Sequence, residues 1–246
     1  MEMPDSLRTR ALALVYGIGR PWIVPAPRDA ATVVLLRDGA VGLEAFLMRR
    51  PLTMAFAPGM YVFPGGAVDD EDLSVGLDLD ADSIFSAPLV VAAIRETWEE
   101  CGVRLEPRAL KPWTHWVTPE VESRRFDTRF FAAQLPPGQE ARVVTDETDH
   151  GEWLTPGRAL AEHAANRMPM LPPTTATLRD LADFETAEAA LLSAQRRTIR
   201  PLIPRPFPAA DGEIEWHLCD ARDGSILDSD YGEPRGSEVR GTRRSW

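Results

Sequence analysis

The chain has 246 residues, of which 44% are hydrophobic, and a formal net charge of −11. This length and apolar content predict one folded domain with additions and argue against a disordered chain. The acidic balance argues against a long nucleic acid as partner, because excess negative charge repels a polyanion. A compact anionic substrate remains compatible with it where a metal ion or an arginine cluster reverses the local field.

Cysteine content and hydropathy indicate in which cellular compartment the protein is expected. The two cysteines, Cys101 and Cys219, have no metal-ligand spacing, and Cys101 falls on the apolar side of a predicted helix. The apolar run Ala11–Val15 is too short to span a bilayer and is not followed by a small-residue cleavage site. We therefore expect a cytoplasmic protein without a membrane partner.

In chain order, residues 1–27 predict an N-terminal extension with a short helix and a proline-punctuated stretch. Apolar and β-branched runs predict strands over 31–36 and 43–48, joined as a hairpin by a turn at Asp38. The acidic stretch 69–86 is expected to be a solvated loop. Further strands are predicted over 60–63, 113–117, 126–134, 152–154 and 214–218, and helices over 88–101, 156–165 and 173–197.

This order predicts an α+β fold rather than a doubly wound sheet, because strands do not alternate strictly with helices. We expect the main domain over 28–227, with the helices of 173–197 as an addition. The polar tail 228–246 is expected to be mobile or to drape over a partner subunit.

The helix predicted over 88–101 carries an acidic face. Glu96, Glu99 and Glu100 stand at i, i+3 and i+4, which places them on one side of the helix. Three carboxylates so close repel one another, and Arg95, four residues before Glu99, offsets part of this. A divalent cation would offset far more, because Mg²⁺ prefers hard oxygen ligands. A bare E-x-x-E-E pattern more often marks a solvated helix face than a metal site, so the surrounding residues must distinguish the two.

Two neighbouring features favour a metal site. Ile94, Trp98 and Cys101 are expected to form an apolar stripe on the opposite face that packs the helix on the core. Ala92 and Ala93 share the carboxylate face and leave room for a ligand, and the upstream Phe63–Gly66 turn lets backbone groups approach it.

The segment Arg95–Val103, preceded by Gly65 and Gly66, resembles the signature of the Nudix hydrolases, G-x5-E-x7-R-E-U-x-E-E-x-G-U, in which U is aliphatic. Its second half matches at every fixed position except the aliphatic one, where Thr97 precedes Trp98. The first half departs from the pattern. Gly66 and Arg95 are 29 positions apart against 14 in the family, which indicates 15 inserted residues, and Glu71 and Asp72 both remain candidates for the first Glu.

An interrupted signature is itself similar to the Nudix branch that includes peroxisomal acyl-CoA diphosphatases. The motifs Met48–Arg50, Phe56–Gly66, Trp116–Pro119 and Arg124–Phe131 resemble the same branch, over roughly residues 30–200. The stricter CoA-recognition string is not reproduced, because its second Arg is absent before Phe63.

The resemblance implies an α/β/α sandwich around a mixed sheet and a homodimer. It also implies that Mg²⁺ or Mn²⁺ binds to the three helix carboxylates and the Gly66 carbonyl, that Arg95 orients Glu99, and that Gly65 contacts the substrate. Family members often draw a further carboxylate from a loop before a late strand. Glu147 is the candidate for this ligand or for the general base, ahead of Glu100 and then Glu152, while His150 is expected to be a surface residue.

The candidate phosphate-binding residues are arginines, since Arg binds phosphate in bidentate fashion: Arg49, Arg50, Arg124, Arg125 and Arg129. Strand periodicity puts Arg125, Asp127 and Arg129 on one face, where they either bind substrate or pair internally. The leading hypothesis is cleavage of a diphosphate bond in CoA or acyl-CoA. The alternatives are hydrolysis of ADP-ribose, NADH or nucleoside triphosphates, and a non-catalytic sensor of nucleotides.

Overall fold

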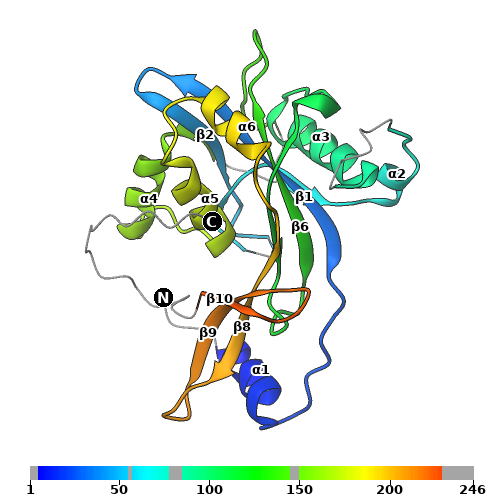
Figure 1. Ribbon diagram of the computed structural model, residues 1–246, viewed down its shortest axis with the longest axis vertical. Helices are drawn as coiled ribbons and strands as arrows, with labels where there is room; N and C mark the ends of the chain where they lie inside the picture. The colour runs from blue at the N-terminus through cyan, green and yellow to red at the C-terminus, as the bar shows by residue number, and fades with distance from the viewer. Residues whose placement is uncertain (1–4, 55–56, 78–84, 145–149, 229–246) are drawn as a thin grey trace.

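The computed structural model describes residues 5–54, 57–77, 85–144 and 150–228. These residues form one mixed ten-stranded sheet with helices on both of its faces (Figure 1). The predicted α+β class and the sandwich architecture are confirmed. None of the helices in the described ranges is both long and apolar enough to cross a membrane.

The sheet runs in the order β10-β9-β8-β5-β6-β1-β2-β3, with β4 paired to β1 and β7 paired to β2. Its strands are β1 (Arg28–Gly39), β2 (Gly42–Arg49), β3 (Tyr61–Val62), β4 (Gly65–Ala67), β5 (Lys111–Val117), β6 (Phe126–Gln134), β7 (His150–Leu154), β8 (Pro201–Pro208), β9 (Ile214–Asp220) and β10 (Ile226–Asp228). β1 and β6 are parallel, and β1 and β2 form the predicted hairpin.

A glycine turn is inserted between β1 and β2 where these two strands diverge. β3 pairs with β2 through Val62, whereas β4 pairs with β1 through Gly66, opposite Ala31. The Val33 N–H donates to the Pro64 carbonyl over 2.8 Å, which fastens the turn to β1. Residues 63–66 are therefore held in the middle of the sheet, at the open end of the β1–β2 hairpin.

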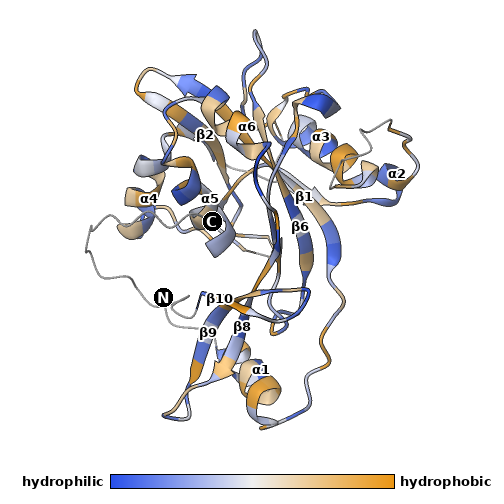
Figure 2. Ribbon diagram, viewed as in Figure 1, coloured by the Kyte–Doolittle hydropathy of each residue, from blue (hydrophilic) through white to orange (hydrophobic). Residues whose placement is uncertain are grey.

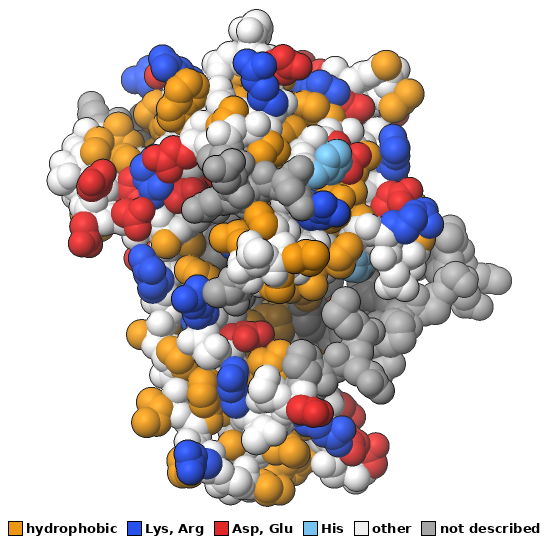
Figure 3. Space-filling view, turned by 180° about the vertical axis from the view of Figure 1, so that it is seen from behind, with side chains coloured by type: hydrophobic (Ala, Val, Ile, Leu, Met, Phe, Trp, Pro, Cys, Tyr) orange, Lys and Arg blue, Asp and Glu red, His pale blue; other side chains and the backbone are white. Residues whose placement is uncertain are grey.

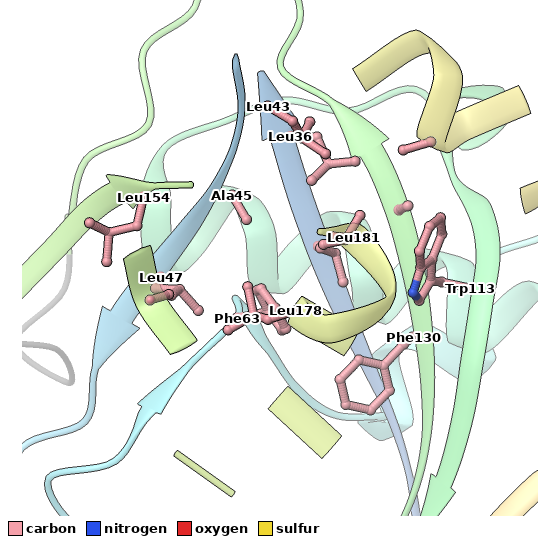
Figure 4. Packing of buried hydrophobic residues seen from close by; sticks show 14 of the residues in the cluster. Leu36, Leu43, Ala45, Leu47, Phe63, Trp113, Phe130, Leu154, Leu178 and Leu181 are labelled. Atoms are coloured by element: carbon pink, nitrogen blue, oxygen red, sulfur yellow. The ribbon is translucent and has the colours of Figure 1, made fainter. Parts of the chain in front are cut away.

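The helices are α1 (Asp5–Tyr16), α2 (Asp70–Leu73), α3 (Ala87–Cys101), α4 (Pro156–Ala164), α5 (Pro172–Leu181) and α6 (Ala187–Ala194), with the short 3-10 helix η1 (Pro107–Ala109) after α3. The helix α3 carries both hydrophobic and hydrophilic residues (Figure 2) and packs on one face of the sheet, over Val33, Leu35 and Phe131. The helices α4, α5 and α6 cover the other face. There Leu178 and Leu181 pack against Trp113 and Phe130 in a second core (Figure 4). The sheet thus separates two cores, and the α3 face bears the acidic helix.

The strand β8 was not predicted. It contains Pro204, Pro206 and Pro208, and such a run is atypical of strands because proline donates no hydrogen bond. Successive N–H groups of a strand point to opposite edges, so prolines two residues apart lose donors on one edge only. β5 pairs with β8 only at Pro201 and Leu202, and β9 forms a full ladder on the other edge.

The N-terminal extension forms the predicted short helix, α1, and docks on this part of the sheet. Arg8 forms an ion pair with Glu213, next to β9, with 2.7 Å between Nη2 and Oε2. The Trp22 ring N–H donates to the Glu120 carbonyl over 2.7 Å. The extension is thus anchored to the main domain at α1 and at Trp22.

Candidate active site

Two successive glycines of the turn are closely approached by other atoms, for different reasons. A Cβ built on Gly65 would lie 2.3 Å from the Ala31 carbonyl oxygen and 2.7 Å from the Thr32 Cα. A Cβ on Gly66 would lie 2.2 Å from Oε1 of Glu96. Gly65 therefore lets two backbone segments approach, whereas Gly66 lets a carboxylate of α3 lie directly against the turn.

Two of the three helix carboxylates converge on this turn. Glu100 accepts a hydrogen bond from the Gly65 N–H, with 2.8 Å between N and Oε2, and Glu96 lies against Gly66. The Glu96 side chain is 16% exposed, and burial raises the pKa of its carboxyl although the neighbouring Arg95 acts to lower it. The Glu99 side chain is 51% exposed.

Arg95 holds the acidic groups in place. Its Nη1 donates to Glu96 over 2.8 Å and to Glu99 over 3.1 Å, and its Nη2 donates to the Ala67 carbonyl over 3.1 Å. Its other face forms a bidentate pair with Asp72, at 3.0 Å from Nε and 2.8 Å from Nη2. The Asp72 hydrogen bond raises the pKa of Arg95 above its ordinary value. Arg95 thus contacts Glu99 as predicted, and Glu96 in addition.

Asp72 corrects the prediction that the whole acidic stretch 69–86 is solvated. It lies in α2, it is buried, and it also accepts the Asp69 N–H over 2.9 Å. Burial acts to raise the pKa of Asp72, but the Arg95 hydrogen bond and charge and the Asp69 N–H together lower it. Of the two candidates for the first acidic residue of the signature, Asp72 is the one that pairs with Arg95. The sequence offered Asp72 as a candidate but did not predict that Arg95 is its partner.

The donors suit a hard cation. Carboxylate oxygens of Glu96 and Glu100 lie against the turn that carries the Gly66 carbonyl, and such oxygens are the ligands Mg²⁺ prefers. Glu99, the most exposed of the three, is also paired with Arg95. Within the described ranges, no three His, Cys, Asp or Glu side chains form a group that could hold a metal ion. The chemistry of the donor set fits the predicted ion, and the arrangement brings together two of its three carboxylates.

The predicted apolar stripe is confirmed for Cys101, which is buried, and for Ile94, which packs against the core, but it is wrong for Trp98. Trp98 is 45% exposed, and Arg104 stacks on its ring at 4.3 Å from the centroid. Ala92 and Ala93, expected beside a ligand, are buried in the core together with Thr97. These small side chains let α3 lie close to the sheet. Glu96 and Glu100, which flank this buried side, are thereby turned toward the glycine turn instead of toward open solvent.

The candidate phosphate-binding arginines lie in two places. Three are in β6 or directly before it, namely Arg124, Arg125 and Arg129, and two are at the end of β2, namely Arg49 and Arg50. Arg129 forms ion pairs with Asp29 at 2.7 Å and Asp127 at 3.0 Å, and Asp127 also contacts His115, so this face of β6 pairs internally. The partners of Arg125 are backbone carbonyls. Arg49 ends β2, opposite Tyr61 and His150, and Arg50 follows it. Figure 3 shows Lys and Arg interspersed with Asp and Glu on one face of the molecule.

Glu147 lies outside the described residues, but the residues flanking its segment are placed. The Val144 N–H donates to the Glu100 carbonyl over 3.1 Å, and His150 pairs with Arg49. Glu152 faces the α4–α6 side of the sheet, because its ladder partner Leu47 belongs to that core. It lines a small cavity there with Arg158 and contacts His150 at 3.2 Å, so it lies on the face opposite α3.

Comparison with known proteins gives concordant matches. The NUDIX domain family model matches residues 26–173. The acyl-coenzyme A diphosphatase NUDT19 of Xenopus laevis is 25% identical, over 57% of this chain and 60% of that protein. The protein of the same name from Homo sapiens is 23% identical, over 91% of this chain and 81% of that protein. A crystal structure of a NUDIX hydrolase from Alicyclobacillus acidocaldarius has 29% identity and a TM-score of 0.61, covering 69% of this chain and 97% of that one.

Proposed function

The chain belongs to the Nudix hydrolases, and from this premise we propose that it cleaves the diphosphate bond of CoA or acyl-CoA with Mg²⁺ or Mn²⁺ bound. The observation that carries the proposal is the convergence of Glu96 and Glu100 on the glycine turn, with Arg95 bridging Glu96 and Glu99. The residues proposed to hold the ion are Glu96, Glu99, Glu100 and the Gly66 carbonyl.

The chemistry is hydrolysis of one phosphoanhydride bond. The oxygen of a water molecule bonds to one phosphorus, the bridging P–O bond breaks, and two phosphomonoesters are released. A bound divalent ion would neutralise phosphate oxygens and lower the pKa of water. The protein supplies a carboxylate that accepts the water proton, for which Glu100 and Glu147 are the candidates. Arg95 acts by positioning the carboxylates at Glu96 and Glu99.

The choice of CoA rests on similarity. The interrupted signature resembles that of acyl-CoA diphosphatases, and two relatives bear that name. A pyrophosphohydrolase acting on ADP-ribose, NADH or nucleoside triphosphates uses the same site and is the main alternative. A non-catalytic sensor is disfavoured, because all three helix carboxylates of the signature are present. The homodimer and the cytoplasmic location stay predictions.

A substrate panel tests the proposal. The purified protein is incubated with Mg²⁺ and CoA, acetyl-CoA, ADP-ribose, NADH or nucleoside triphosphates, and products are identified by mass spectrometry. We expect 3′,5′-ADP and (acyl-)phosphopantetheine. In ¹⁸O-labelled water the label identifies the phosphorus that is attacked. Turnover of ADP-ribose alone would refute the CoA assignment, and no turnover of any compound would refute the catalytic one.

A further inference from the structure

A second cavity lies at the start of the two parallel central strands, apart from the glycine turn. Its volume is about 280 Å³. It is lined by Pro25, Ala26, Arg28, Ser123, Arg124, Arg125 and Phe126. Sites for drug-sized ligands occupy roughly 300–1,000 Å³, so this cavity fits one part of a nucleotide rather than a whole cofactor.

The cavity gathers three arginines, and among the described residues only Arg28 has a carboxylate in ion-pair contact, Asp69 at 3.8 Å. Arg125 is 9% exposed, and it donates from Nε to the Thr118 carbonyl over 3.0 Å and from Nη1 to the Pro25 carbonyl over 2.8 Å. In the described part of the chain, neither its Nη2 nor the exposed side chain of Arg124 has a hydrogen-bond or ion-pair partner. Guanidinium groups placed in this way favour an anion with several oxygens.

The backbone around the cavity is fixed. The Arg28 N–H donates to the Arg125 carbonyl over 2.9 Å, and the Phe126 N–H donates to Oγ1 of Thr118 over 3.0 Å. Arg125 is anchored by two carbonyls, as described above. The backbone that carries the donors is therefore held by hydrogen bonds and Arg125 is held in position, which reduces the ordering cost of binding.

The cavity is connected to the candidate active site. Nη2 of Arg28 lies 3.8 Å from Asp69, and another oxygen of Asp69 lies 3.4 Å from Nη2 of Arg95. Arg28 precedes Ala31, the ladder partner of Gly66, by three residues of one strand, a rise of about 10 Å. The cavity and the glycine turn thus adjoin the two ends of one short stretch of β1.

We propose that this cavity binds a phosphomonoester on the nucleoside part of the substrate, with Arg124 and Arg28 as the specificity-determining residues and Arg125 as their support. The proposal rests on the proposed function and narrows it. It explains how the site would prefer CoA, which carries a 3′-phosphate, over ADP-ribose, NADH and dephospho-CoA, which do not.

The kinetic test compares CoA with dephospho-CoA. For the unaltered protein we expect kcat/KM to be about tenfold or more higher with CoA, as for a charge-assisted contact. Arg124→Ala should lower kcat/KM for CoA about tenfold more than for dephospho-CoA. Arg108→Ala is the matched control, because Arg108 is exposed and lies before β5, at the end of that strand away from the cavity. An equal effect of Arg124→Ala on both substrates would overturn the proposal.

A binding test separates this inference from the proposed function. Calorimetry with Mg²⁺ compares 3′,5′-ADP with AMP, neither of which has a diphosphate bond to be cleaved. We expect 3′,5′-ADP to bind about tenfold more tightly or better, and Arg124→Ala to remove most of the difference. If CoA is not cleaved but this difference is present, the proposed function fails and the subsite stands. If the two nucleotides bind equally, the subsite is refuted even where CoA is cleaved.

Discussion

Replacing Gly66 by alanine separates the catalytic use of the glycine turn from its structural use. The added Cβ would lie 2.2 Å from Oε1 of Glu96 and 2.5 Å from its Cδ. Because these atoms end a flexible side chain, the carboxylate can retreat by about 1 Å, and a misplacement of that size in an active site can cost about 10²-fold in rate. We therefore expect kcat/KM to fall by about that factor, while stability falls by less than about 1 kcal/mol.

The matched control is Gly65→Ala. Its Cβ would lie 2.3 Å from the Ala31 carbonyl oxygen, which belongs to a central strand and has no rotamer to adopt. We expect this variant to lose about 2 kcal/mol of stability or more, through forced backbone movement.

Two measurements decide the matter. Mg²⁺-dependent turnover of CoA gives the catalytic loss, and urea unfolding without metal gives the stability loss. If Gly66→Ala kept the activity of the unaltered protein, catalysis would not depend on the position of the Glu96 carboxylate against the turn. If it unfolded as readily as Gly65→Ala, Gly66 would be a structural residue.

Three further outcomes are expected. Asp72→Asn should lower the free energy of unfolding by about 2 kcal/mol, because it removes a charged acceptor from a largely buried pair. The exposed Asp69→Asn should cost less than about 0.5 kcal/mol in the same urea titration; equal losses would contradict this reading. The pKa of Asp72 is lowered below 3.8, so its contribution is present above that pH and is lost as the pH falls through the folded-state value. Acid unfolding should therefore differ least between Asp72→Asn and the unaltered protein at the lowest pH. Glu100→Gln should reduce kcat by about 10²–10⁴-fold with an unchanged circular dichroism spectrum, and unfolding without metal would instead show that the carboxylate is structural.

The sequence predicted those parts of the fold that local periodicity determines. The hairpin 31–48 and the helix over 88–101 agree with β1, β2 and α3, because alternating and 3.6-residue patterns are visible in one segment at a time. The strand β8 could not be recognised in this way. Its prolines are tolerated because β9 pairs with one edge while β5 pairs with the other edge only at Pro201 and Leu202, and this arrangement is a property of the assembled sheet.

The phase of α3 shows a second limit. Hydrophobicity alone favoured Trp98 as a buried residue over Ala93 and Thr97. The structure reverses this, since close approach of the helix to the sheet requires small side chains and Trp98 instead stacks with Arg104 at the surface. The signature placed the acidic trio correctly on α3. The rotation of the helix about its own axis, which brings Glu96 and Glu100 against Gly66, is determined by packing.

The interruption of the signature has a simple energetic account. Asp72 follows Gly66 at the family spacing of G-x5-E, so the extra residues lie between Asp72 and Arg95, which are 23 positions apart instead of 8. By the general scaling of loop-closure entropy, lengthening a connection by that ratio costs only about 1 kcal/mol. The bidentate contact of Arg95 with the buried Asp72 is strong enough to offset such a cost. An interrupted motif can thus keep an intact site, because the ion pair joins in space the two halves that the insertion separates in the chain.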